Sequence, residues 1–393
     1  MLYNLLQYTD EWLDSIGLFS VLQVLYQLEF RAFFAVLFSF LIVLVFGKPT
    51  IRWLIKQKVG DQPEFYHSDV NELMASKAAT PTMGGILICS SIFLTIALFA
   101  DLRNSYVHLS LIVLGWLAVV GGFDDWLKLT SATRKPGSRE GLYAWEKLLF
   151  QLGIGAVAGF FLYRNTFDND VAHVLVLPLQ RTYVPNAESL VLEEGVIVLG
   201  FAAFMIIATL LIAGTSNAVN LTDGMDGLAT GCVAICALVF VILTHIVGTE
   251  ELAAKLLFLH VPNSAELVIP CGAMFGACLG FLWYNCHPAH VFMGDTGSLP
   301  LGGIIGFVAI VTRQELMLFI VGGVFVMEAL SVIAQVGYFK WTKGSRIFRC
   351  APIHHHFQEL GWSEPKIVMR AWLISAIGVI VGLILFLLDK GWY

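Results

Sequence analysis

Long apolar runs separated by short polar segments extend along the whole chain. A helix that crosses a bilayer needs about 20 mostly apolar residues. Ten runs approach or exceed that length, and they predict spans near residues 30–52, 83–100, 106–122, 147–163, 196–214, 225–247, 267–284, 298–312, 315–339 and 370–388. The pattern therefore predicts an all-α, polytopic integral membrane protein with about ten transmembrane helices.

The segments between the runs are too short for a soluble domain, so residues 1–393 are predicted to form a single membrane-embedded domain. The stretch 164–195 contains Val174-Leu175-Val176-Leu177, which favours a short hairpin. Residues 250–260 form an amphipathic stretch that can lie on the membrane surface. The composition agrees, because 58% of the residues are hydrophobic and 13% are charged, against about 25% charged in a soluble domain. The net charge of -6 argues against a nucleic-acid partner.

Lysine and arginine are distributed unevenly among the loops. Most of them follow the first, third and ninth runs. Loops rich in these residues stay in the cytoplasm, which predicts that both termini lie outside. The loops after the fifth and seventh runs fall on the same cytoplasmic side but are rich in Asp, Asn and Gly instead. An active site is therefore predicted on this side, in loops near 53–82, 123–146, 215–224, 285–297 and 340–369.

The first polar cluster is Phe123-Asp124-Asp125 at the end of the third run. Two adjacent carboxylates at a membrane boundary repel each other, and desolvation disfavours their charged forms, so a cation or a proton must compensate. A solvated helix end is the simpler interpretation. The preceding Gly121-Gly122 weakens that interpretation, because it permits close approach of another segment.

The second cluster places Asn217, Asn220, Asp223 and Asp226 at intervals of three residues. On a helix or a 3₁₀ segment this spacing puts them on one face. Such a row between two apolar runs suits a hydrated cation or a polyhydroxylated ligand, and an ordinary interhelical loop is the alternative.

The third cluster runs from Asn285 to Ser298 and includes Gly294-Asp295-Thr296-Gly297 just before the eighth run. Glycines and free N–H groups at the start of a helix favour an anion. A carboxylate beside such a site indicates a divalent metal that bridges it to phosphate, which is the usual role of Mg²⁺. The segment is not a Walker A loop, because no Gly-Lys-Ser/Thr follows.

The fourth cluster is His354-His355-His356, in the basic loop after the ninth run. Sequence neighbours rarely bind one tetrahedral zinc ion, so phosphate contacts or proton handling are favoured over a metal or a plain surface tract. Lys77 and Thr82 flank Pro81 at the start of the second run and could reach an anionic ligand. Carboxylates, basic groups and anion-binding backbone are the components of phosphoryl transfer, and no Ser or Cys nucleophile has a base beside it.

These segments resemble the polyprenyl-phosphate N-acetylhexosamine-1-phosphate transferases, a membrane family. The resemblance covers nearly the whole chain and rests on Phe123-Asp124-Asp125, Asn220 to Ala229, Val291 to Ser298 and Pro352 to His356. Within the family, the segments Thr80 to Gly85 and Ala351 to His356 resemble the branch that uses a muramoyl-pentapeptide. The resemblance implies transfer of phospho-N-acetylmuramoyl-pentapeptide from its UDP-linked precursor to undecaprenyl phosphate, giving lipid I and UMP. This is the first membrane step of peptidoglycan synthesis, in the bacterial cytoplasmic membrane. The resemblance also implies Mg²⁺ and a homodimer.

The resemblance assigns a role to each candidate residue. Asp295 is expected to bind Mg²⁺, Asp124 and Asp125 to handle the lipid phosphate or its proton, and His354 to assist them. Nucleotide-pocket residues are expected to be Asn220, Asp223, Asn285, Phe292 and Ser298. The phosphate and sugar region is expected to be lined by Lys77, Thr82, Lys128, Lys147, Gln335, His355 and His356, and Asp226 is also expected to bind substrate.

Three alternatives remain open at this point. The mechanism is either direct attack by the lipid phosphate or a two-step route through an aspartyl-phosphate. A sibling enzyme that moves N-acetylglucosamine-1-phosphate shares most of the motifs. An ion-coupled transporter predicts ionisable residues near the centres of the spans, whereas here they lie at span ends with Glu328 as the chief exception.

Overall fold

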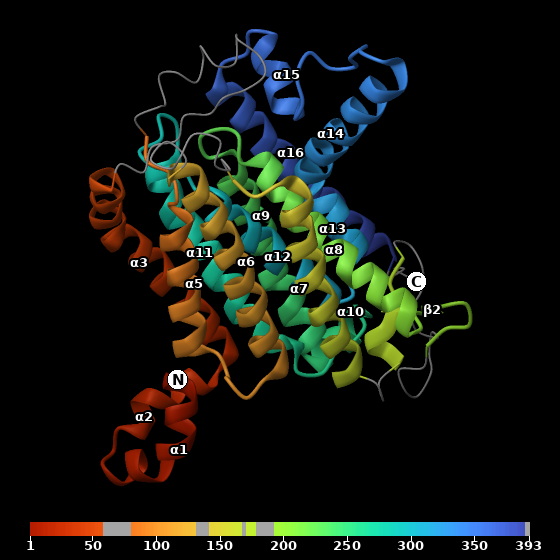
Figure 1. Cartoon of the computed structure of the whole chain (residues 1–393). Helices are drawn as coiled ribbons and strands as arrows, with labels where there is room; N and C mark the ends of the chain where they lie inside the picture. Colours follow the sequence, from red (N-terminus) through yellow and green to blue (C-terminus); the bar gives the residue numbers. More distant parts are fainter. Residues whose placement is uncertain (58–79, 131–140, 167–169, 178–191, 390–393) are drawn as a thin grey trace.

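The computed structural model describes residues 1–57, 80–130, 141–166, 170–177 and 192–389 (Figure 1). The helices in the first half of the chain are α1 (Leu2–Ser15), α2 (Phe19–Leu22), η1 (Gln23–Tyr26), α3 (Leu28–Lys56), α5 (Gly85–Phe99), α6 (Ser105–Thr130), α7 (Ala144–Asn165) and η3 (Asp170–His173). Those in the second half are α8 (Phe201–Thr222), α9 (Leu228–Gly248), α10 (Glu250–Leu256), η4 (Ser264–Leu267), α11 (Val268–Asn285), α12 (Asp295–Val311), α13 (Glu315–Val321), α14 (Gly323–Thr342), α15 (Ile353–Glu359) and α16 (Glu364–Asp389).

The all-α membrane fold is confirmed. Among the described residues, eight helical segments are long and apolar enough to cross a membrane, and α5 and α12 are shorter apolar helices of 15 and 17 residues. Together they account for the ten predicted runs, with one difference. The ninth run, predicted as one span over 315–339, is divided at Gly322 into α13 and α14. The run has no polar residue at this point, but the Gly322-Gly323 pair favours a break because glycine is a poor helix former.

Helix α12 occupies the centre of the bundle, and all its residues from Asp295 to Val311 are buried. It packs most extensively against α6 and α8, while α11 packs against α3 and α9 (Figure 1). A helix that is apolar on every side is stable either in a protein core or in lipid, and the burial of every residue of α12 shows that neighbouring helices surround it. The helix that begins with the third polar cluster is therefore the one that the rest of the bundle holds in place.

Two helices continue past the ends of their apolar runs. Helix α6 extends to Thr130, although the run ends near residue 122, and α8 extends to Thr222, although its run ends near 214. Both extensions carry polar clusters that the hydrophobic pattern predicts to lie in loops. The additional turns place these side chains on rigid helix ends beside the N-terminus of α12.

The predicted hairpin is present in part. Strand β1 (Val174–Leu175) pairs antiparallel with β2 (Ile197–Val198), so the partner strand lies just beyond the stretch in which the hairpin was expected. The predicted amphipathic stretch contains α10. Both features lie at the end of the bundle opposite α15, and α14 projects away from the other helices at the α15 end (Figure 1).

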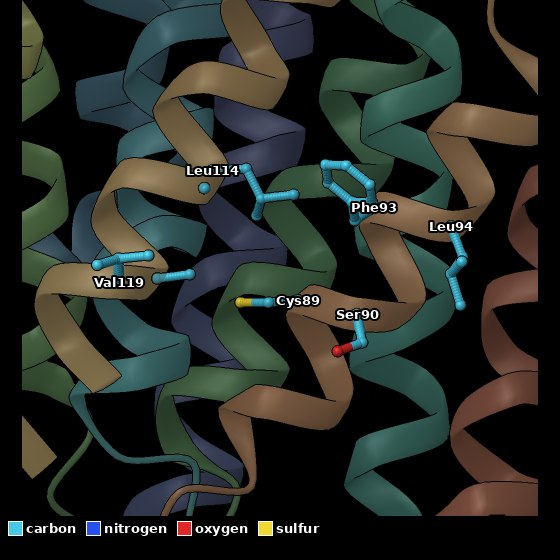
Figure 2. A pocket seen from close by; sticks show the side chains of 8 residues that line it. Cys89, Ser90, Phe93, Leu94, Leu114 and Val119 are labelled. Atoms are coloured by element: carbon cyan, nitrogen blue, oxygen red, sulfur yellow. The ribbon is translucent and has the colours of Figure 1, made fainter. Parts of the chain in front are cut away.

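An apolar pocket of about 460 Å³ lies between α5 and α6 (Figure 2). Its walls contain Cys89, Ser90, Phe93, Leu94, Leu114, Gly115, Ala118 and Val119. Phe93, Leu94 and Val119 are exposed, so the pocket opens on the outer apolar surface of the bundle. It has no charged side chain in its lining, so its chemistry does not suit a phosphate group.

Candidate active site

Three aspartates meet where the C-terminal turns of α6 reach the N-terminus of α12. Asp124, Asp125 and Asp295 are all buried, and each offers a carboxylate oxygen within 4.8 Å of the others. Two lysines, Lys128 on α6 and Lys147 on α7, lie among them. The cluster therefore combines three negative and two positive groups in a site largely withdrawn from water.

Asp124 faces the two lysines. Its Oδ2 lies 2.9 Å from Lys128 Nζ and 2.7 Å from Lys147 Nζ. Its Oδ1 accepts a hydrogen bond from the Leu142 backbone N–H at 2.6 Å. Oδ1 thus binds the backbone just before α7, and Oδ2 faces the positively charged groups.

Asp125 points to a different partner, because consecutive residues on a helix are about 100° apart. Its Oδ2 accepts hydrogen bonds from the backbone N–H of Thr296 at 2.9 Å and from the Thr296 hydroxyl at 2.6 Å. Its Oδ1 accepts from the Asp295 N–H at 3.2 Å. This carboxylate therefore satisfies free N–H groups and the positive dipole end of α12, which is how an N-cap residue stabilises a helix.

Asp295 is held from two sides. Its Oδ1 accepts from Asn220 Nδ2 at 2.8 Å, and its Oδ2 lies 2.6 Å from Lys147 Nζ. The same Asn220 amide donates to Ser298 Oγ at 2.9 Å. The second and third sequence clusters are thereby joined, and Lys147 bridges the carboxylates of Asp124 and Asp295.

Glycines permit this close packing. A Cβ at Gly121 would collide with the Asp295 carbonyl oxygen, so α6 approaches α12 at a point where it has no side chain. Gly294, which precedes α12, has φ 71° and ψ 176°, a region essentially restricted to glycine. A Cβ there would lie 2.6 Å from Asp125 Oδ2 and 2.9 Å from Thr82 Oγ1. These contacts place the buried Thr82 beside the aspartate cluster.

The turn after α8 carries the rest of the second cluster. Asp223 accepts a hydrogen bond from the Gly294 backbone. Burial, together with the negative charges of Asp295 and Asp125, raises the pKa of Asp223 well above its usual range.

Asp226 belongs to a separate network. Its Oδ2 lies 3.0 Å from His287 Nδ1 and accepts from the Ala289 N–H at 3.1 Å, while its own N–H donates to Glu364 Oε1 at 2.7 Å. The network connects the start of α9, the loop before α12 and the start of α16. Asp226, His287 and Glu364 also lie close enough together to bind a metal ion. Their hydrogen bonds with backbone N–H groups show, however, that they connect these three segments of the protein.

His354 is buried beneath α14. Its Nδ1 lies 3.0 Å from Glu328 Oε2, and its ring lies against Gly224 in the turn after α8. The structure thus brings the fourth cluster into contact with the second. It also assigns Glu328 a buried hydrogen-bonded partner, a question that the sequence left open.

Several candidates bind parts of the protein itself. Asn285 donates to the Val291 carbonyl and accepts from Thr230 Oγ1. Gln335 Oε1 accepts from the Ile347 and Phe348 N–H groups. The remaining contacts of this kind are His355 Nδ1 with Gln358 Oε1, His356 Nδ1 with the Arg349 N–H, and the Phe292 N–H with the Pro81 carbonyl. Lys77 lies outside the described residues.

Four residues in these networks have no role that the sequence motifs predict. Thr296 has a visible signal, because it stands next to Asp295 inside a recognised motif, and Glu328 has one as a carboxylate within an apolar run. The Leu142 N–H and Glu364 carry none, since their contacts depend on how α7 and α16 are placed.

The donor set suits a divalent cation. Oxygen ligands from carboxylates are those that Mg²⁺ prefers, and the two carboxylates bridged by Lys147 already share a positive group. Asp124 and Asp295 are therefore the residues placed to hold such an ion, while the oxygens of Asp125 accept hydrogen bonds from α12.

Comparison with known proteins identifies the class. The family model described as glycosyl transferase family 4 matches residues 106–313, and a phospho-N-acetylmuramoyl-pentapeptide-transferase signature matches residues 77–89. The bundle with its acidic cluster is thus a membrane-embedded transferase of glycosyl transferase family 4.

Curated relatives narrow the class. The protein from Thermodesulfovibrio yellowstonii named phospho-N-acetylmuramoyl-pentapeptide-transferase is 41% identical over 384 residues, which are 98% of this chain and 99% of the relative. A protein of the same name from Rickettsia bellii is 41% identical over 383 residues, 98% of each chain. One from Desulfotalea psychrophila is 42% identical over 360 residues, 91% of this chain and 93% of the relative. The chain belongs to the phospho-N-acetylmuramoyl-pentapeptide-transferase family.

Proposed function

We propose that the chain transfers phospho-N-acetylmuramoyl-pentapeptide from its UDP-linked precursor to undecaprenyl phosphate, giving lipid I and UMP. The observation that carries this proposal is the cluster of the buried Asp124, Asp125 and Asp295 with the partly exposed Lys128 and Lys147 at the end of an apolar bundle. Phosphoryl transfer depends mainly on positioning and charge neutralisation. A cluster of both signs at a bilayer boundary can receive a soluble diphosphate and a lipid phosphate.

The favoured mechanism is direct attack. An oxygen of undecaprenyl phosphate forms a bond to the β-phosphorus of the nucleotide sugar, and the bond from that phosphorus to the bridging oxygen breaks to release UMP. Bound Mg²⁺ supplies charge neutralisation on the diphosphate. Asp124 orients the lipid phosphate or takes its proton, because its Oδ2 accepts no hydrogen bond from the backbone of the described residues, whereas both oxygens of Asp125 accept hydrogen bonds from α12.

The two lysines contribute charge of their own. Lys128 and Lys147 both contact Asp124 and Asp295 and are partly exposed, so their ammonium groups can turn to phosphate oxygens. Asn220 and Ser298 hold Asp295 in place.

We propose further that this end of the bundle faces the cytoplasm of a bacterium, since the loops on this side carry most of the Lys and Arg residues. A homodimer is proposed from the family resemblance.

A transfer assay tests the proposal. Purified protein in detergent micelles is given radiolabelled UDP-N-acetylmuramoyl-pentapeptide and undecaprenyl phosphate, with and without Mg²⁺. Label is expected in the lipid fraction only with Mg²⁺, and Asp124→Asn and Asp295→Asn are each expected to lose about 100-fold or more in rate. Asp101→Asn is the matched control, because Asp101 binds Asn4 and Arg103 at the other end of the bundle. Full activity in both site variants refutes the assignment.

The same assay distinguishes the sibling reaction and the two-step route. Turnover of UDP-N-acetylglucosamine alone contradicts the proposed substrate. A stable phospho-sugar adduct trapped on Asp124 or Asp295 contradicts direct attack.

A further inference from the structure

Two side chains of α16 bind the backbone of the turn between α8 and α9. Glu364, the first residue of α16, accepts a hydrogen bond from the Asp226 N–H at 2.7 Å through Oε1. Trp372, further along the same helix, donates from Nε1 to the Gly227 carbonyl at 3.2 Å. Helix α16 thus binds two consecutive residues of the turn that carries the second polar cluster.

The contact of Trp372 depends on the absence of a side chain at Gly231, in the first turn of α9. A Cβ at Gly231 would collide with the indole ring, so the ring lies in the space that this glycine leaves open. Gly227 itself has φ 78°, a left-handed conformation that favours glycine. Its N–H donates to Asn285 Oδ1 at 3.2 Å, so the N–H and the carbonyl of Gly227 are both bound. Asn285 and Trp372 therefore fix the end of the turn from two sides.

The same turn places two candidate substrate residues. Asp223 accepts a hydrogen bond from the Gly294 backbone just before α12, and Asp226 contacts His287 in the loop that leads to α12. A shift of the turn would therefore move both carboxylates relative to Asp295 at the start of α12. Groups that bind a substrate have to be held within about 0.5 Å of their productive positions. The backbone of this turn is thus a part of the site whose position matters for binding.

The rest of α16 is held by other contacts. The helix packs against α9 and α13. Two glycines, Gly378 and Gly382, permit close approach to α13, and a Cβ at Gly378 would lie 2.6 Å from the Ile320 carbonyl oxygen. This apolar packing involves neither Glu364 nor Trp372. Loss of either polar contact should therefore free the turn without detaching the helix.

We propose that Glu364 and Trp372 are positioning residues that hold the turn from Asp223 to Gly227 where its carboxylates bind the nucleotide sugar. The inference rests on the proposed function for the identity of that ligand. Both residues act through the backbone of the turn, and no covalent bond changes in the binding that they support.

The kinetic test of Trp372 uses Trp372→Phe, which keeps an aromatic ring but removes the N–H donor. Loss of one hydrogen bond changes a binding constant about 5-fold, so the KM for the nucleotide sugar is expected to rise about 5-fold. The kcat and the KM for undecaprenyl phosphate should stay unchanged, because ground-state binding of one substrate is lost. Trp283→Phe is the matched control, since Trp283 lies at the end of α11 with 72% of its surface exposed.

Glu364 is tested by two substitutions. Glu364→Ala removes the carboxylate that accepts from the Asp226 N–H, and it is expected to raise the same KM about 10-fold or more, because hydrogen bonds to charged groups are stronger. Glu364→Gln keeps an amide oxygen as acceptor and should show a smaller increase. Glu250→Ala is the control, because Glu250 is likewise the first residue of a helix, α10, at the other end of the bundle. Equal changes in the KM values of both substrates would overturn the proposal.

Hydrogen exchange gives a readout that needs no substrate. In detergent-solubilised protein without ligand, mass spectrometry should show exchange of the amides in residues 223–231 that is about 5-fold faster or more in Trp372→Phe and Glu364→Ala. Amides within α12 should keep their wild-type rates. Unchanged exchange in 223–231, or faster exchange throughout the bundle, would contradict the inference. Failure of the proposed function would instead appear as absent transfer by the wild-type protein with the selective difference in exchange intact.

Discussion

Replacing Asp125 by alanine should cost folding stability more than it costs any chemical step. The carboxylate accepts hydrogen bonds of 2.6 Å and 2.9 Å from Thr296 and one of 3.2 Å from the Asp295 N–H. A hydrogen bond to a charged group contributes about 1.5–3 kcal/mol, and loss of an N-cap alone costs about 0.5–2 kcal/mol. The three bonds share one carboxylate and are not additive. The expected loss for Asp125→Ala is therefore about 3 kcal/mol.

The assay is equilibrium unfolding in mixed detergent micelles, followed by tryptophan fluorescence and circular dichroism. Thr296→Val removes only the hydroxyl contact and should cost about 1 kcal/mol. The double variant should show a coupling energy of about 1 kcal/mol, since Asp125 and Thr296 touch. If Asp125→Ala unfolds like the wild type yet has no activity, Asp125 acts directly in the chemistry and the reasoning is wrong.

Three further predictions follow from the site. Gly294→Ala should destabilise the fold by about 1–3 kcal/mol, because its φ and ψ are unfavourable for alanine and its Cβ would crowd Asp125 and Thr82; the same unfolding assay would disprove this if the midpoint did not move. The pKa of Asp223 is higher in the folded protein than in the unfolded chain. The stability of the fold therefore falls as the pH rises from the unfolded pKa towards the folded pKa, because the buried side chain must give up its proton. Asp223→Asn should therefore stabilise the protein at neutral pH and have little effect at acidic pH, and equal effects at both would contradict it. Lys147→Met should tighten Mg²⁺ binding measured by calorimetry, because the Lys147 ammonium group contacts the carboxylates of Asp124 and Asp295 and so competes with the metal ion for them. Unchanged binding would show that Lys147 and Mg²⁺ do not compete.

The membrane-spanning helices could be predicted because each corresponds to a local run of apolar residues. The polar extensions of α6 and α8 could not be predicted in this way. Helix α6 continues through Asp124 and Asp125, and α8 continues through Asn220, because α12 supplies hydrogen-bond partners that only the tertiary structure reveals. The break between α13 and α14 has a local signal in the Gly322-Gly323 pair, but the apolar residues on both sides of the pair favoured a single span.

The candidate site shows a similar division. The sequence has Asp124, Asp125 and Asp295 at the ends of apolar runs on one side of the bundle, and the structure brings their carboxylates together. Their separate contacts were not predictable, since adjacent aspartates look equivalent in a sequence. Gln335 satisfies backbone N–H groups of a neighbouring loop, and such a need arises only once the loop has its shape. The functional roles assigned to these residues remain predictions.

The short length of α5 and α12 has a consequence for the surrounding lipid. At 1.5 Å per residue, their 15 and 17 residues extend about 22 and 25 Å, against a hydrocarbon core of about 30 Å. Neither helix can reach both surfaces of an unperturbed bilayer. If the shortfall of α12 falls at its N-terminal end, Asp295 lies below the head-group level of the neighbouring lipid. Bilayer thickness then becomes a variable of the enzyme, because it sets how far a lipid head group must sink to meet the carboxylates.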